Sequence, residues 1–310
     1  MSALLAAAVV VVALAAYAVT GGADFGGGVW DLLASGPRKG EQRAAISGAI
    51  APIWEANHVW LILVVVLLFV AFPPVFAALS IVLHIPLSLM LVGVVLRGAA
   101  FVFRAYDPEG GQGWGRVFSV ASTFTPVALG ICLGAAFVGF EVEGTDFVSP
   151  WLAPFPVVLG LFVLGLFSFL AAVYLGARTT GPLQEDFRLR ALVSGAVAGV
   201  LAFVCLALAP RQLLTLSLGF HILTGLCAVG ALVALWKRVW RLARPLAVAQ
   251  VLLIVAGWAW AQYPMALAPG WTIADAAAPE GVLNAILVAL AAGSVLLVPA
   301  FIWLYRVFAR

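Results

Sequence analysis

The sequence predicts an all-α, polytopic membrane protein with about nine transmembrane helices. Hydrophobic residues fill 65% of the 310 positions and charged residues only 9%, whereas soluble domains are about 45–50% apolar and about 25% charged. This composition excludes a soluble enzyme, a disordered protein and a nucleic-acid-binding protein. The placement of the basic residues, described below, supports the same fold class.

Nine stretches are long enough to cross the hydrocarbon core of a bilayer, which takes about 20 mostly apolar residues. The first stretch has no positively charged start, so we interpret it as a transmembrane helix and not as a signal peptide. No long linker divides the chain, and we expect one integral membrane domain over residues 1–310. The predicted spans are residues 3–23, 57–77, 80–102, 118–140, 154–176, 189–209, 213–235, 246–264 and 283–307.

Turn signals set the predicted connections between these spans. Pro73-Pro74 precede the short break between the second and third spans, and Pro210-Arg211-Gln212 separate the sixth from the seventh. We expect a tight helical hairpin at both places. Residues 40–53 are expected to form a short interfacial helix that leads into the second span.

The basic residues fall on one side of this topology. All of them except Arg97 and Arg211 lie in alternate loops or at the C-terminal end, once Arg190 at the start of a span is assigned to the adjoining loop. The loops 141–153 and 265–282 carry acidic residues but no Lys or Arg. Because Lys and Arg accumulate in cytoplasmic loops, the pattern predicts an N-terminus outside and a C-terminus inside.

Few ionisable residues lie in or beside the spans, and each is a functional hypothesis because intramembrane charge is costly. Asp24 ends the first predicted span, Glu55 opens the second, and Arg97 lies about two turns inside the third. Burial disfavours a charged carboxylate and a nearby guanidinium favours it, so such a group can load and release protons. The alternative is that Asp24 and Glu55 are solvated helix ends, with Arg97 reaching out to the interface.

Other candidate motifs favour structure over chemistry. The glycine-rich stretch 21–28 lacks the strand and the Gly-Lys-Ser/Thr of a phosphate loop, and we interpret it as close helix packing or a helix break. His84 and His221 both fall in the outer half of their spans, which leaves a haem-binding pair open as a minor alternative. No Cys/His cluster has the spacing of a zinc site.

Three stretches resemble one known family. They are Trp54-Glu55-Ala56-Asn57-His58-Val59-Trp60, the run LRGAAFVFR at 96–104, and GGADFGGG at 21–28. Together they are similar to subunit II of the cytochrome bd quinol oxidases. The family's first-span motif, Asp-Gly-Phe-Asp-x-Gly-x-Gly, keeps its second carboxylate as Asp24 but has Gly21 in place of the first. Glu55 stands where the family has a shorter Asp.

The resemblance implies a haem-free subunit that is not catalytic alone. It belongs to a respiratory-chain complex in the inner membrane, and this complex oxidises quinol and reduces oxygen to water. It implies a larger, haem-bearing subunit I, which holds haem b with haem d, or haem b only, and the quinol site. It allows for a small accessory subunit and for a structural quinone or lipid against this chain. It also implies two four-helix bundles plus a peripheral helix.

The role implied for this chain is to stabilise subunit I and to supply a cytoplasmic proton path. Glu55 and Asp24 would transfer the protons, supported by the residues Arg97, Trp54, Asn57, His58 and Trp60. The alternatives are a purely structural scaffold subunit, a secondary transporter and a stand-alone haem b protein. A transporter is expected to carry polar residues or broken helices at the membrane midplane, whereas the charges here crowd one edge.

Overall fold

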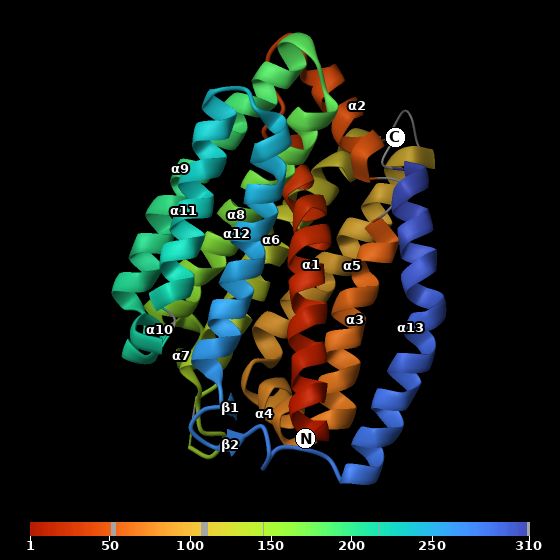
Figure 1. Cartoon of the computed structure of the whole chain (residues 1–310). Coiled ribbons are helices and arrows are strands. Elements are labelled where there is room, and N and C mark those ends of the chain that lie inside the picture. The colour runs from red at the N-terminus through yellow and green to blue at the C-terminus, as the bar shows by residue number, and fades with distance from the viewer. Residues whose placement is uncertain (51–53, 107–110, 145, 217, 309–310) are drawn as a thin grey trace.

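The structure is a bundle of long helices that run in alternating directions (Figure 1). This computed structural model describes the chain except for residues 51–53, 107–110, 145, 217 and 309–310. Within the described residues, nine helices are long and apolar enough to cross a membrane, which confirms the predicted number. They are α1 (Ser2–Leu32), α3 (Trp54–Ala71), α5 (His84–Tyr106), α6 (Gly111–Val138), α8 (Pro154–Arg178), α9 (Gly181–Leu208), α11 (Leu218–Trp236), α12 (Trp240–Gln262) and α13 (Glu280–Phe308).

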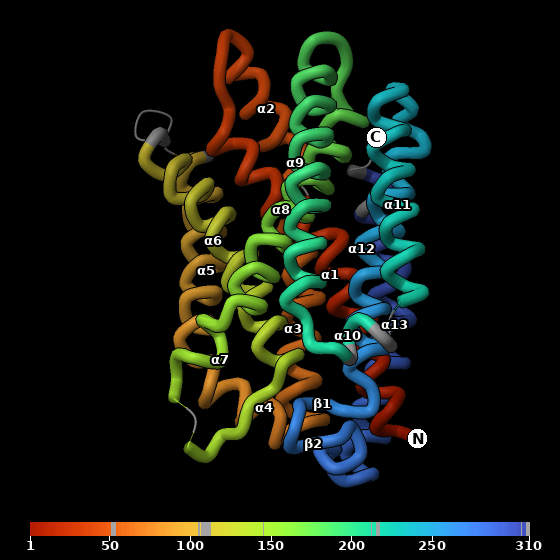
Figure 2. Tube along the Cα trace, turned by 90° about the vertical axis from the view of Figure 1, so that its left-hand side faces the viewer, coloured from red at the N-terminus to blue at the C-terminus, as the bar shows by residue number. Residues whose placement is uncertain are grey.

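Short elements distinguish the two ends of the bundle. One end, which we call the α2 end, carries α2 (Lys39–Ile50), the turn between α8 and α9, the turn between α11 and α12, and the last turn of α13 (Figures 1 and 2). The opposite end, the β end, carries the N-terminus, α4, α7 and a two-stranded antiparallel sheet. The remaining short elements are α4 (Pro73–Val82), α7 (Ser149–Leu152), α10 (Arg211–Leu216), β1 (Met265–Leu267) and β2 (Trp271–Thr272).

Several predicted boundaries are wrong. Helix α1 continues nine residues beyond the predicted span, to Leu32, so its glycine-rich part does not break the helix. Helix α9 starts at Gly181, before the predicted residue 189. The hairpin expected after Pro73-Pro74 contains a helix of its own, α4, because the two prolines occupy the first helical positions and start a new helix. The short helix α10 likewise replaces the tight turn expected after Pro210.

The interfacial helix expected at 40–53 is present as α2. Its predicted last three residues, 51–53, lie outside the described residues. Gln42, Ile46 and Ile50 are buried and follow one another at four-residue intervals, so one face of α2 packs on the bundle.

Glycines let α1 approach its neighbours closely. A Cβ built on Gly26 would lie 2.0 Å from the carbonyl oxygen of Phe167 in α8, and one on Gly28 would lie 2.1 Å from Cβ of Ser122 in α6. Real side chains do not tolerate such distances. The glycine run therefore serves close helix packing, which is one of the two outcomes expected from the sequence.

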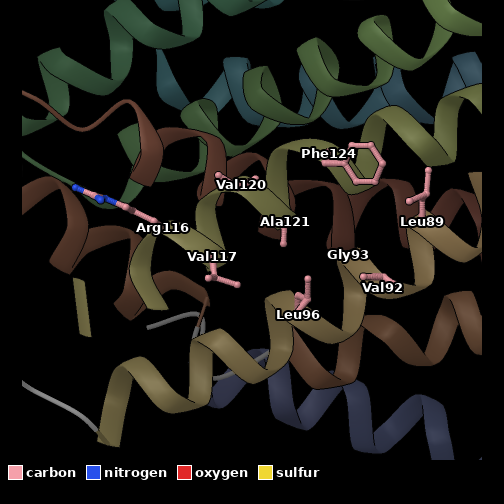
Figure 3. A pocket seen from close by; sticks show the side chains of 9 residues that line it. All are labelled: Leu89, Val92, Gly93, Leu96, Arg116, Val117, Val120, Ala121 and Phe124. Atoms are coloured by element: carbon pink, nitrogen blue, oxygen red, sulfur yellow. The ribbon is translucent and has the colours of Figure 1, made fainter. Parts of the chain in front are cut away.

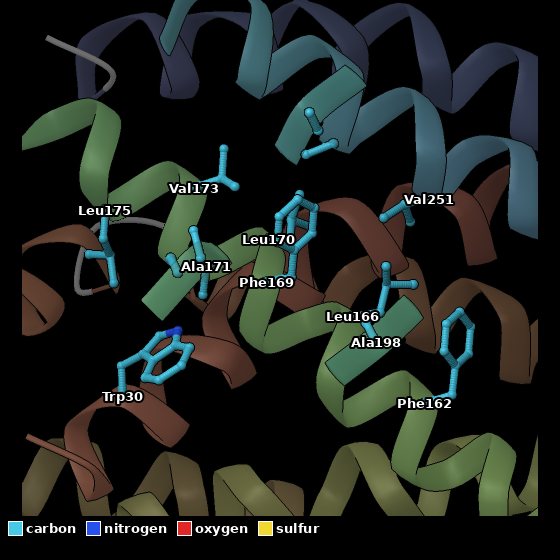
Figure 4. Packing of buried hydrophobic residues seen from close by; sticks show 14 of the residues in the cluster. Trp30, Phe162, Leu166, Phe169, Leu170, Ala171, Val173, Leu175, Ala198 and Val251 are labelled. Carbon is cyan, nitrogen blue, oxygen red and sulfur yellow. The ribbon is translucent and has the colours of Figure 1, made fainter. Parts of the chain in front are cut away.

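The largest apolar cluster is centred on α8. Figure 4 shows Phe162, Leu166, Phe169 and neighbouring α8 residues packed with side chains from α1, α9 and α12. Trp30 belongs to this cluster and its indole Nε1 donates a hydrogen bond to the carbonyl of Ser168, at 2.8 Å. The bond joins the α2-end part of α1 to the centre of the bundle.

Helix α13 lies at the outer edge of the molecule (Figure 1). No residue in the most apolar 18-residue window of its described part is buried. One described contact with the bundle is a stack of Phe301 on Trp60 of α3, with ring centroids 5.3 Å apart. This placement agrees with a peripheral ninth helix, while the division of the others into two four-helix bundles stays a prediction.

The packing of α1 leads to a first testable prediction. Gly26→Ala should lower the thermal midpoint of the purified protein, because overpacking at a backbone contact costs about 1–3 kcal/mol. The measurement is a melting curve in detergent. Gly199→Ala is the matched control, since nothing lies within 4 Å of a Cβ at that position in α9. An equal midpoint for both variants would contradict the close approach of α1 to α8.

Candidate functional site

A buried polar cluster joins α1, α3 and α5. Asp24 of α1 is only 5% exposed, and Asn57 of α3 is fully buried. The amide nitrogen of Asn57 donates to the Asp24 carboxylate and also, at 3.4 Å, to the carbonyl of Thr20 one turn earlier. Asp24 is therefore an interior residue of a helix, and the interpretation of it as a solvated helix end is wrong.

Arg97 of α5 lies beside this carboxylate and is 1% exposed. The Asp24 charge interacts with it, although the two side chains do not form a close ion pair. Its Cζ lies 4.7 Å from the centroid of the Phe25 ring and 5.3 Å from that of Phe118, which gives cation–π contacts. Its Nε and Nη2 have no hydrogen-bond partner among the described residues. The alternative in which Arg97 reaches out to the interface does not fit this burial.

His58 and Trp54 form the aromatic side of the cluster. The ring of His58 lies 6.0 Å from that of Tyr17 and 6.2 Å from that of Trp54, measured between centroids. Both ring nitrogens of His58 are buried, and neither has a hydrogen-bond partner in the described part of the chain. Trp60 lies further along α3, where it stacks on Phe301. The aromatic residues of the Trp54–Trp60 motif thus point to different neighbours.

Glu55 is not part of the cluster. Its side chain is exposed on the surface of the isolated chain, at the start of α3. It forms no hydrogen bond or ion pair with any residue that the structure describes. The two carboxylates predicted to act together therefore lie in different surroundings, Asp24 inside the bundle and Glu55 on its surface near the α2 end.

Sequence reasoning missed Asp31, which is fully buried in the last turn of α1. Its carboxylate lies 3.1 Å from Nη1 of Arg104 and 3.8 Å from Nε of Arg43, and accepts a 2.8 Å hydrogen bond from the hydroxyl of Ser119. The signal was present in the sequence, because Asp31 follows Asp24 by seven residues and two helical turns. It was overlooked because the first span was ended at residue 23.

The same seven-residue spacing relates Arg97 to Arg104 on α5. Two levels result, one with Asp24 and Arg97 and one with Asp31 and Arg104, about 10.5 Å apart along the helix axes. Phe118 of α6 lies between them, with its ring centroid 5.3 Å from Cζ of Arg97 and 5.7 Å from that of Arg104. At the level nearer the α2 end, Asp31 forms direct ion pairs. At the inner level, two nitrogens of Arg97 have no hydrogen-bond partner among the described residues.

A separate polar network fastens α2 to α9. Arg38 donates to Asp186 through Nε and Nη2, at 2.8 and 2.5 Å, and Gln42 donates to the same carboxylate at 2.9 Å. Arg190 donates to Oε1 of Gln42 at 2.7 Å. The hydrogen bond with Asp186 raises the pKa of Arg38 above its usual value. The network is structural in character, because its hydrogen bonds link the start of α2 directly to α9.

The two histidines weighed as a haem pair each contact a backbone carbonyl. Nδ1 of His84 lies 2.8 Å from the carbonyl of Ile81, and Nε2 of His221 lies 2.8 Å from that of Leu213. In the described part of the chain, no group of three or more His, Cys, Asp or Glu could hold a metal ion. These contacts give no support to a stand-alone haem b protein.

A groove of about 410 Å³ lies on the outer face of α5 and α6, away from the polar cluster. Figure 3 shows apolar side chains such as Leu96, Val120 and Phe124 along it, with Arg116 at one end. Its lining offers no groups for acid–base chemistry. The candidate functional site is therefore the polar cluster inside the bundle.

Comparisons with known proteins place these features in a family. The sequence model described as "Cytochrome bd terminal oxidase subunit II" matches residues 2–308. Among curated proteins, Cytochrome bd-I ubiquinol oxidase subunit 2 of Escherichia coli (strain K12) is 29% identical over 210 residues, which cover 64% of this chain and 53% of that protein. Cytochrome bd ubiquinol oxidase subunit 2 of Bacillus subtilis (strain 168) is 29% identical over 202 residues, covering 63% and 59%. The chain thus spans little more than half the length of these relatives.

The fold matches a solved structure over nearly its whole length. The structure is that of bd oxidase from Geobacillus thermodenitrificans, with a TM-score of 0.78 and 22% sequence identity. The match covers 99% of this chain and 98% of that one. At this identity the comparison establishes the arrangement of the helices.

The ion pair between Arg104 and Asp31 predicts that the two residues are strongly coupled in their effect on stability. Arg104→Met should destabilise the protein by about 3–5 kcal/mol, because it leaves the buried Asp31 carboxylate without its nearest cation. The double variant Arg104→Met/Asp31→Asn should recover part of this loss, since the uncompensated charge is gone. Thermal midpoints of the wild type, both single variants and the double variant measure the coupling. Simple additivity of the two single changes would contradict a direct interaction.

Proposed function

The chain belongs to the cytochrome bd terminal oxidase subunit II family, and on that premise we propose that it acts as the second subunit of a quinol:oxygen oxidoreductase. The observation that carries the proposal is the family match over residues 2–308. With nine membrane-length helices in its described part, the chain is a multi-pass protein of the bacterial inner membrane. It is not expected to be catalytic alone.

The proposed partner is a larger subunit I that binds the haems and the quinol. Haem b with haem d, or haem b only, would supply the oxygen chemistry there. This chain itself is proposed to bind no haem. Quinol and oxygen are the proposed substrates of the complex, in line with the relatives' names as ubiquinol oxidase subunits.

We place the α2 end in the cytoplasm. Most basic residues are in segments at this end, and Lys and Arg mark cytoplasmic loops. The β end would then face the outside, together with the acidic loop residues. In this orientation Glu55 lies near the cytoplasmic surface. Asp24 lies at nearly the same depth, because its partner Asn57 follows Glu55 by only two residues, about 3 Å along α3.

The proposed task of this subunit, beside stabilising subunit I, is to conduct protons from the cytoplasm. Reduction of oxygen to water consumes protons at a buried site, and a carboxylate relay carries them through a low-dielectric interior. Asp24 fits such a relay because its carboxylate is buried inside the bundle, next to the Phe25 ring on which the Arg97 guanidinium packs. Asn57 orients the carboxylate through its hydrogen bond. Glu55, on the surface, would collect protons or pass them to subunit I.

A purely structural role is the second candidate, and Asp31 favours it. Its carboxylate is fully engaged in ion pairs with Arg104 of α5 and Arg43 of α2, which hold these helices to α1. A scaffold needs no proton transfer at Asp24 or Glu55. Variants that keep the shape of these two residues but remove their charge therefore separate the two roles.

Copurification tests the subunit assignment. A tagged chain taken from native membranes should carry a larger, haem-bearing partner, and the isolated complex should consume oxygen when supplied with quinol. Gel analysis, a reduced-minus-oxidised spectrum and an oxygen electrode provide the measurements. A partnerless chain without haem would refute the assignment and reopen the transporter alternative.

Replacing either carboxylate by its uncharged amide should slow turnover. In the assembled complex, Asp24→Asn and Glu55→Gln are expected to lower quinol oxidase activity about tenfold or more, since a positioned proton-transfer group contributes about 10²–10⁴-fold. Haem content should stay unchanged. Glu280→Gln, at an exposed carboxylate where α13 begins, is the matched control. Full activity in both relay variants would instead support the scaffold role.

A further inference from the structure

One face of α1 carries a polar stripe that continues past Asp24 towards the α2 end. Asp24, Gly28 and Asp31 are spaced by four and three residues, so they lie above one another on the helix. This stripe contacts α6 at Gly28 and at Asp31. The buried carboxylate that sequence reasoning missed is thus in line with the proposed relay residue.

Helix α6 places two buried hydroxyls against this stripe. Ser119 donates its hydrogen bond to Asp31, at 2.8 Å. Ser122, one turn further on, is fully buried and lies where a side chain on Gly28 would be. The missing side chain at Gly28 therefore leaves room for a hydroxyl between the two carboxylates.

Several donors and acceptors around this stripe lack partners. The Ser122 hydroxyl, Nε and Nη2 of Arg97, and both ring nitrogens of His58 are buried without a hydrogen-bond partner in the described structure. Buried polar groups are normally hydrogen-bonded, and where protein atoms do not serve, an ordered water with two to four polar neighbours does. Ser122 lies at Gly28, between Asp31 and Asp24 along α1, whereas Arg97 and His58 lie against Phe25, next to Asp24.

We propose that Asp31, Ser119 and Ser122, together with bound water, form a second proton-conducting branch that joins the α2 end of the bundle to Asp24. The proposal rests on the proton-conducting role given to Asp24 above. It assigns proton entry to the edge of the Asp31 site within this chain, distinct from the surface carboxylate Glu55.

The surroundings of Asp31 suit an entry point. The side chains of Arg43 and Arg104 that border it are 37% and 21% exposed, so water reaches the edge of the site. The Asp31 carboxylate accepts the hydrogen bond of Ser119 and so fixes that hydroxyl at the water-exposed edge.

The transfer balances without any further reactant. A proton enters through water at the α2 end beside Ser119, while Asp31 stays ionised in its ion pairs and holds the Ser119 hydroxyl in place. Each hydroxyl or water then accepts one proton and releases another to the next, until Asp24 is protonated. Asp24 later passes that proton on and returns to the carboxylate. Every intermediate group ends in its starting state, and no bond other than O–H is formed or broken.

The test measures proton uptake in the assembled oxidase. Fully reduced complex is mixed with oxygen in the presence of a pH-indicator dye, in H₂O and in D₂O. Ser122→Ala should slow proton uptake about threefold or more and enlarge the solvent isotope effect. The fold should be retained, because the variant removes a hydroxyl that has no hydrogen-bond partner in the described structure. Asp31→Asn, which keeps an acceptor oxygen for Ser119, should also slow uptake.

Matched variants separate the possible outcomes. Ser194→Ala is the control, because Ser194 is a buried serine that bonds the carbonyl of its own helix one turn earlier. Slow uptake in Asp24→Asn with normal uptake in Ser122→Ala would overturn the branch and leave the proposed function standing. Normal uptake in Asp24→Asn would overturn both. Slow uptake in Asp31→Asn alone would make Asp31 a structural residue and overturn the branch.

Discussion

The close approach of α1 to α6 and α8 is the contact on which the rest of the arrangement depends. At Gly26 the backbone of α8 occupies the space of a side chain, and at Gly28 a serine of α6 does so. Such an approach excludes lipid from this face of α1. It therefore allows Asp24 and Asp31 to sit inside the bundle, where only protein groups and bound water can compensate their charge.

The sequence predicts the membrane class and the number of helices well, because both follow from apolar length. It predicts the end of α1 poorly, since hydropathy falls at the glycine-rich stretch while the helix continues to Leu32. A hydropathy boundary marks where polar residues begin, and not where backbone hydrogen bonding stops. The same limitation hid Asp31, whose burial depends on Arg104 and Ser119 from helices far along the chain.

The sequence likewise predicts the candidate site only in part. That Asp24 and Arg97 lie near each other was foreseen from their depth in the membrane. The contact with Asn57 agrees with the Trp54–Trp60 motif, which places an amide one turn into α3. The exposure of Glu55 agrees with the alternative in which it is a solvated helix end, and the sequence leaves this open because depth along a helix says nothing about which way a side chain points. At this surface position, the partner subunit proposed above would be able to reach it.

The two charged levels differ in how their arginines are satisfied, and this difference bears on function. Arg104 is held by direct contacts with Asp31 and Ser47, whereas Arg97 keeps two unpartnered nitrogens beside Asp24. A fully paired ion pair resists change in protonation, because losing one charge leaves the other uncompensated. Two charges that are not in direct contact lose less when one of them is neutralised. The same helices thus provide a rigid anchor at the α2 end and, two turns further in, the carboxylate for which we propose a change of charge.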